Sequence, residues 1–173
     1  MPERRTRGAH AVCSDFLLGR GAGGSCRPNI NREARKRLAR KPKCRIRTEY
    51  ISREWKVLPA QVAKTLTLRV GEDAIIVVTC GDSRLDNRKV KEELGGKGHM
   101  MPGSEASEIT GHPVGAITPL CLASVLPVFF DIRLKRFEEV VTAGGSTHAA
   151  IRIPLTRFAQ LTGATWVDVC KEM

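Results

Sequence analysis

Residues 62–80 read VAKTLTLRVGEDAIIVVTC. Apolar and polar side chains alternate along Val62–Val70, and a period of two residues is typical of a β-strand with one buried face. Gly71-Glu72-Asp73 predicts a turn, and the continuous apolar run over residues 74–80 predicts a second, buried strand. The stretch therefore predicts a hairpin that forms part of a sheet.

Shorter patterns predict the elements around this hairpin. Further strands are expected at residues 126–131, 139–143, 149–153 and 165–169. Helices are expected over residues 51–58, over 86–94 with Gly95-Gly96 at its end, from Ser104 as N-cap to Gly111, and from Thr156 as N-cap to Gly163. Most connections are too short for a βαβ crossover. We therefore predict an α/β fold of the α+β type, with a mixed, curved, largely antiparallel sheet or open barrel of about six to seven strands and helices packed outside it.

The positive charge of the chain lies in its first quarter. The formal net charge is +11 over 173 residues, and residues 1–47 hold 14 of the 29 Lys and Arg but only 3 of the 18 Asp and Glu. Residues 48–173 are electrically balanced. We therefore divide the chain into a basic leader, residues 1–47, and one domain, residues 48–173.

The leader contains few apolar side chains to offset the entropy of ordering it, so disorder or a lone basic helix is expected there. Its basic residues could contact RNA phosphates, and an Arg-rich start also allows an organelle transit peptide. A solvated tail or a mis-assigned gene start remains the alternative. The candidate phosphate contacts are Arg32, Arg35, Lys36, Arg37, Arg40, Lys41 and Lys43.

Several classes of protein are disfavoured by what the sequence lacks. No apolar run approaches the roughly 18 residues that cross a bilayer, and no secretory segment is evident, which favours the cytoplasm and free thiols. No C-x-x-C pair, ligand-spaced His, Walker loop or G-x-S-x-G elbow is present, so we expect neither a metal nor a cofactor. Cys80, Cys121 and Cys170 lie in or beside apolar runs and are expected to be buried.

Lys64 does not fit the strand on which it lies. The period of two puts it on the same face as Val62, Leu66 and Leu68. If that face is buried, the ammonium must reach the rim of the sheet, pair with an anion, or await a ligand's negative charge. Asp82 and Asp131 are possible partners, although both positions also suit the capping of turns.

Two glycine-containing loops are candidates for binding a ligand through their backbone. Gly115-Ala116-Ile117-Thr118-Pro119 is a G-x-x-x-P segment, in which the glycine allows close approach and the proline fixes the exit. Residues 143–148 form another turn, with Gly144, Gly145 and His148. Without a nameable partner, His148 is more typical of a surface turn than of a catalytic base.

Together these segments resemble a known family, the YbaK/prolyl-tRNA-synthetase-associated editing domains. The similarity extends from Arg47 to Val169 in matching order and spacing. It is carried by VAKTL (62–66), GDSRLD (81–86), TGHPVGAITPL (110–120), LPV (126–128) with Asp131, AGG (143–145), LTGA (161–164) and VDV (167–169).

The resemblance implies a freestanding hydrolase that removes a wrongly attached amino acid from the 3′ end of a tRNA, usually tRNA for proline, without a metal or a covalent enzyme intermediate. It places Lys64 at the phosphate and ester region of the terminal adenosine, and the backbone at Gly115 on the aminoacyl carbonyl. The partner is then the acceptor end of an aminoacyl-tRNA. The residues expected to bind substrate are Ala116, Ile117, Thr118, Pro119, Gly144, Gly145 and His148.

The chain departs from the family pattern in three places, one of which is Leu120-Cys121, where the family often has Phe-Gly or Leu-Gly after the proline. The family commonly has two glycines where this chain has Gly115-Ala116, so the Ala116 methyl group either narrows the accepted amino acid or tightens the loop. The family also opens with a helix and a strand that residues 1–46 do not show. A non-catalytic tRNA-binding or regulatory domain, and a nucleic-acid binder driven by the leader alone, are therefore the alternatives to a deacylase.

Overall fold

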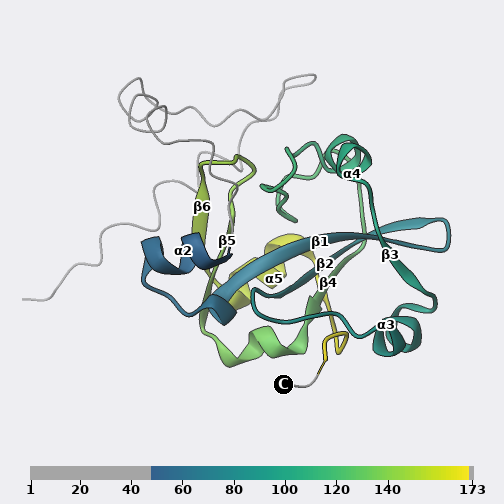
Figure 1. The fold of residues 1–173 in the computed structure, drawn as a ribbon, viewed down its shortest axis with the longest axis horizontal. Helices are drawn as coiled ribbons and strands as arrows, with labels where there is room; N and C mark the ends of the chain where they lie inside the picture. Colours follow the sequence, from purple (N-terminus) through teal and green to yellow (C-terminus); the bar gives the residue numbers. More distant parts are fainter. Residues whose placement is uncertain (1–47, 172–173) are drawn as a thin grey trace, which may run out of the picture. The chain divides into compact units, whose positions relative to one another are not determined.

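The computed structural model of the protein describes residues 48–171 (Figure 1). The predictions made for the leader fall outside these residues. Seven strands form one open sheet in the order β6-β5-β1-β2-β4-β7, and β3 pairs with β1. The strands are β1 (Val62–Val70), β2 (Asp73–Cys80), β3 (Gly98–Met100), β4 (Val128–Asp131), β5 (Glu139–Ala143), β6 (Ala150–Pro154) and β7 (Thr165–Val167).

The long ladders of the sheet are antiparallel, as expected. They join β1 to β2 and β5 to β6, with a shorter one between β1 and β3. The parallel ladders, β1 with β5, β2 with β4 and β4 with β7, each span two or three residue pairs. The sheet is therefore mixed and does not close into a barrel, which confirms the predicted fold class and selects the open sheet over the barrel.

Four α-helices and two 3-10 helices surround the sheet in the described part of the chain. The α-helices are α2 (Thr48–Trp55), α3 (Asn87–Leu94), α4 (Gly103–Thr110) and α5 (Leu155–Thr162), and the 3-10 helices are η1 (Pro59–Gln61) and η2 (Ile132–Arg136). In Figure 1, α2 lies beside β5 and β6 at one end, whereas α3 and β3 lie at the other.

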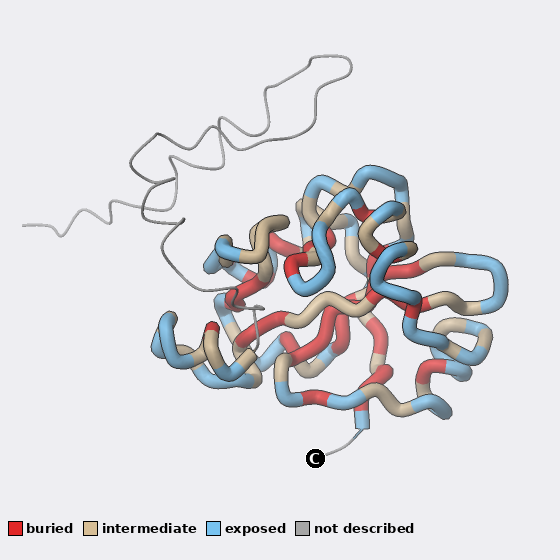
Figure 2. Tube along the Cα trace, turned by 45° about the horizontal axis from the view of Figure 1, so that its top comes forward, coloured by how far each residue is buried: buried red, intermediate tan, exposed pale blue. Residues whose placement is uncertain are grey.

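β2 is buried on both faces, as its continuous apolar run predicts (Figure 2). Ile76 and Val78 belong to a cluster that includes Phe158 of α5. Ile75 and Val77 point the other way and belong to a cluster that includes Val90 of α3. Helices therefore cover both faces of the central hairpin.

The predicted helix starts were correct where a side chain caps the helix and wrong where a proline precedes it, whereas the glycines at the C-terminal ends of α3, α4 and α5 were predicted correctly. The Asp86 carboxylate accepts from the Arg88 N–H at 2.9 Å and begins α3, and Gly95, with φ of 76°, ends it. Ser104 and Thr156 are not N-caps, because α4 and α5 begin one residue after Pro102 and Pro154. These prolines hold φ near −55° with an extended ψ, which sets the helix start without a side-chain bond.

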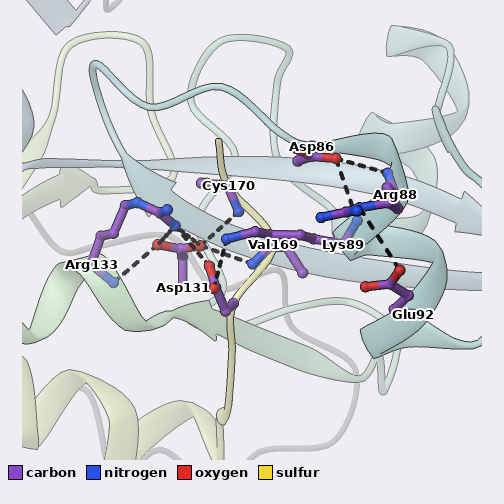
Figure 3. Close-up of polar contacts among 9 residues, drawn as sticks. Asp86, Arg88, Lys89, Glu92, Asp131, Arg133, Val169 and Cys170 are labelled. Carbon is purple, nitrogen blue, oxygen red and sulfur yellow. Dashed lines mark hydrogen bonds and ion pairs between the residues drawn. The ribbon is translucent and has the colours of Figure 1, made fainter. Parts of the chain in front are cut away.

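A buried carboxylate fixes the last described segment of the chain against the sheet (Figure 3). Asp131, fully buried at the N-cap of η2, accepts from the N–H groups of Arg133, Val169 and Cys170 at 3.0, 3.1 and 3.1 Å. The Arg133 guanidinium pairs with it and, at 2.9 Å, with Asp168. Asp131 thus caps a turn, one of the two roles expected of it, and makes no ion pair with Lys64.

Replacing Asp131 by Ala should destabilise the domain by about 3–5 kcal/mol, because Arg133 and two backbone N–H groups would lose a buried acceptor. Urea unfolding of the two proteins measures the difference. Asp73→Ala, at an exposed carboxylate on β2, is the matched control and should change stability by less than about 0.5 kcal/mol. Equal losses in the two variants would contradict the role given to Asp131.

Candidate functional site

The candidate site lies where one edge of β1 lacks a strand neighbour. On the edge opposite β2, β1 pairs with β5 only through Val62 and Ala63, and with β3 only from Leu68 onward. Residues 64–67 have no strand on that side. A cavity of about 160 Å³ opens beside this gap. It is lined by Thr48, Ile51, Val62, Ala63, Lys64, Thr65, Gly115, Ile117, Thr142 and Ala143.

The gap leaves backbone groups of β1 without partners. The Thr67 carbonyl accepts from the Met101 N–H at 3.1 Å, so the backbone groups of Thr67 point toward the open edge. Because these groups alternate along a strand, those of Thr65 point the same way. Neither the N–H nor the carbonyl of Thr65 has a backbone partner among residues 48–171. Thr65 therefore offers one donor and one acceptor on the side of the cavity.

Lys64 reaches this region half-buried, on the same face as the buried Leu68. Its ammonium donates to the Ser83 carbonyl, and no carboxylate within residues 48–171 forms an ion pair with it. Burial lowers the pKa of Lys64, and the nearby Asp82 carboxylate acts in the opposite direction. With one of three donors used, two N–H groups remain for an anionic or carbonyl ligand.

Ser83 is itself held by the rest of the domain. Its N–H closes a turn onto the Cys80 carbonyl at 3.1 Å. The chain just beyond it pairs with the C-terminal segment, through Asp86 N–H to the Val169 carbonyl and Lys171 N–H to the Arg84 carbonyl, each at 2.9 Å. The carbonyl that holds the Lys64 ammonium is thus connected to the Asp131 network.

The loop over residues 112–119, hereafter the Gly115 loop, exposes its backbone at the cavity. Gly115 has φ of 86°, a left-handed conformation that suits glycine, and a Cβ added there would meet nothing within 4 Å. The Ala116 N–H donates to the Pro113 carbonyl at 2.9 Å. No acceptor for the Gly115 or Ile117 N–H occurs within the described residues. These two groups can therefore face a carbonyl or phosphate oxygen.

The other residues of the loop are part of its interior. Ala116, Thr118 and Pro119 are buried, and none of them lines the cavity. Of the two effects expected of the Ala116 methyl group, this position favours tightening of the loop. The second predicted turn supports the loop rather than the cavity, because a Cβ added to Gly145 would lie 3.0 Å from the His112 ring. Gly144 and His148 also lie outside the lining, and His148 is exposed.

Sequence patterns missed two threonines of the cavity. Thr65 and Thr142 both line it, and both hydroxyl groups are buried without a hydrogen-bond partner in the described structure. Alternation would have shown that Thr65 points opposite to Lys64, but only the pairing of Ala63 with Thr142 shows that β5 meets β1 at this point. Two polar groups without partners inside a cavity suit a polar ligand.

The described residues offer no sign of metal binding or of thiol chemistry. No group of three His, Cys, Asp or Glu within residues 48–171 could hold a metal ion. Burial raises the pKa of Cys80 and, to about 12, that of Cys170, so neither favours the thiolate. Cys121 is exposed, contrary to the expectation, because its φ of 52° places it in the turn after Pro119. None of the described helices is long and apolar enough to span a membrane.

Comparison with known proteins finds relatives for most of the chain. Residues 47–161 match the aminoacyl-tRNA editing domain family. The uncharacterized protein YwhH of Bacillus subtilis is 36% identical over 115 residues, which cover 65% of this chain and 73% of YwhH.

Two crystal structures resemble the fold closely. A protein described as a candidate trans-editing enzyme for prolyl-tRNA synthetase superposes with a TM-score of 0.71 and 26% identity, over 76% of this chain and 83% of that one. The hypothetical protein APE2540 superposes with a TM-score of 0.70 and 27% identity, over 76% of this chain and 87% of that one.

The stability of a Lys64→Met variant should differ from that of the wild type in a pH-dependent way. The unfolded chain keeps the ordinary lysine pKa near 10.5, whereas the folded value is lower. As pH rises through the folded pKa toward 10.5, the unfolded wild type binds more protons than the folded one, so its stability rises relative to Lys64→Met. Urea unfolding of both proteins at pH 7, 8.5 and 10 measures this, and a constant difference would contradict the burial of a charged Lys64.

Proposed function

The chain belongs to the aminoacyl-tRNA editing domain family, and we propose that it is a deacylase that hydrolyses the ester of a mischarged tRNA, in particular tRNA for proline. The observation that supports this most strongly is that Lys64 and Gly115, from segments distant in sequence, line one small cavity. A cavity of about 160 Å³ suits a small aminoacyl group rather than a whole nucleotide.

In the proposed complex the aminoacyl group enters the cavity and the terminal adenosine stays outside. The carbonyl oxygen lies against the Gly115 and Ile117 N–H groups, and the Lys64 ammonium lies near the ester and the terminal phosphate. A water molecule, oriented directly or through a hydroxyl group of the substrate, attacks the carbonyl carbon and gives up a proton. The N–H groups stabilise the oxyanion, the bond to the ribose oxygen breaks, and that oxygen takes a proton.

No protein nucleophile is needed for this reaction. An aminoacyl ester is already activated, so binding it in a productive orientation and stabilising the developing charge account for the rate enhancement. Lys64 suits this role because its ammonium is held by the Ser83 carbonyl and two of its donors remain free. The choice of tRNA for proline rests on the relative described as a candidate trans-editing enzyme for prolyl-tRNA synthetase.

Lys64→Ala should lower the deacylation rate of mischarged tRNA for proline by about a hundredfold or more, because one charged donor to the reacting region is lost. The assay follows release of labelled amino acid under single-turnover conditions, with circular dichroism to verify folding. Lys91→Ala, at an exposed lysine on α3, is the control and should retain the wild-type rate. If Lys64→Ala hydrolyses the tRNA as fast as the wild type, the role proposed for Lys64 is wrong. Binding by the wild type without hydrolysis would favour the non-catalytic alternative.

We further propose that the basic leader adds affinity by contacting tRNA phosphates. Deleting residues 1–45 removes 13 of the 29 Lys and Arg and should reduce the dependence of log Kd on log salt concentration, since fewer counterions are released on binding. Filter binding between 50 and 200 mM KCl, roughly the range in which phosphate contacts weaken most, measures the slope. If both proteins gave the same slope, the leader would not contact tRNA phosphates and would be a solvated tail.

A further inference from the structure

The cavity contains polar groups that the proposed reaction does not use. Carbonyl and phosphate recognition occupies Lys64 and the Gly115 loop, whereas Thr65 and Thr142 line the same cavity with buried hydroxyl groups that have no partner within the described residues. An unpaired buried hydroxyl typically destabilises a protein by about 1–3 kcal/mol. Ser83 and Thr118 also have buried hydroxyl groups without partners, but Thr65 and Thr142 are the two of these four residues that line the cavity, where a ligand could bond to them.

The sheet register brings the two threonines to the same face. Thr142 of β5 pairs with Ala63 of β1, and Thr65 lies two residues further along β1. Since side chains two apart on a strand share a face, Thr65 and Thr142 are diagonal neighbours on one side of the sheet. The β1–β5 ladder ends where Ala63 pairs with Thr142, and the cavity opens directly beside these two residues.

We infer that Thr65 and Thr142 select for an aminoacyl group with a small hydroxyl-bearing side chain, of the serine or threonine class. This inference rests on the deacylase proposal and adds the substrate's side chain to it. A hydroxyl group can donate to one threonine and accept from the other, which satisfies both. A methyl side chain such as alanine's leaves both unpaired, and a thiol is only a weak partner.

The lining supports a neutral polar side chain rather than a charged one. Among the described residues that line the cavity, Lys64 alone carries a charge. A cationic side chain would be repelled by its ammonium, and an anionic one would compete with the phosphate for it. The remaining lining is small or apolar, with Ile51, Val62 and Ile117, so the volume excludes large polar side chains.

The test uses the full-length protein and tRNA for proline charged separately with serine, threonine and alanine. The wild type should deacylate the seryl or threonyl ester at least roughly tenfold faster than the alanyl ester, as expected for one hydrogen-bonded group of about 1.4 kcal/mol. Thr65→Val and Thr142→Val should each slow the hydroxylated substrates by roughly the same factor, so that their rates approach the rate for the alanyl ester. Thr65→Ser, which keeps the hydroxyl, should retain the selectivity.

Thr67→Val is the matched control. Thr67 lies on the same strand and face as Thr65 and is 5% exposed, but it does not line the cavity. The Thr67→Val variant should therefore have the same substrate selectivity as the wild type. Thermal unfolding provides a second readout. Removing an unpaired buried hydroxyl should leave the melting temperatures of Thr65→Val and Thr142→Val unchanged or raised, which also verifies that both variants fold.

The outcomes separate this inference from the function on which it rests. If the wild type hydrolyses the alanyl ester as fast as the seryl and threonyl esters, the inference is wrong and the deacylase proposal stands. Equal slowing of all esters by the valine variants also overturns it, because the threonines would then bind a part common to every aminoacyl group. No hydrolysis of any ester by the wild type overturns the proposed function itself.

Discussion

The interrupted edge of β1 is the constraint on which the candidate site depends. A buried strand normally has every backbone N–H and C=O paired, yet β1 shares one edge between β5 and β3 and has no strand beside residues 64–67. The parallel ladder with β5 ends after Ala63, because β5 itself ends at Ala143 before the Gly144-Gly145 turn. The Gly115 loop and α2 enclose the space that remains. Unpaired groups at this point are the consequence of the strand order.

A second set of interactions, which begins at Asp131, holds the Lys64 ammonium in place. Asp131 fixes residues 169 and 170, that segment pairs with Arg84 and Asp86, and Ser83 then presents its carbonyl to Lys64. Each step uses backbone groups, which allow little adjustment. The arrangement explains how a lysine on an apolar face tolerates partial burial without a carboxylate partner. It also keeps the ammonium charge unneutralised, as recognition of a phosphate or an oxyanion requires.

Local patterns predicted most of the strands, whereas the site depended on contacts that they cannot reveal. The bounds of β1 and β5 match the expectation because alternation and composition determine them. β3 was missed, since three residues around His99 carry no period, and the N-caps at Ser104 and Thr156 were wrong because the preceding prolines start those helices. Lys64 was recognised as anomalous from its strand face, and the family resemblance joined it to Gly115. The part played by Thr142 could not be predicted, because the β1–β5 pairing joins segments almost eighty residues apart.

We propose that different groups of the cavity contact different parts of the substrate. In the proposed complex, Lys64 and the Gly115 loop contact the phosphate and the ester carbonyl, which every aminoacyl-tRNA has, so they would govern the rate for all substrates. In the same proposal, Thr65 and Thr142 contact the amino-acid side chain, which differs between substrates. Because Lys64 and Thr65 point to opposite faces of β1, a hydroxyl can be removed from Thr65 without moving the Lys64 ammonium. On the proposed assignment, rate and selectivity are therefore separable in this site, and the hydroxyl groups make a distinction between substrates that an apolar side chain could not make.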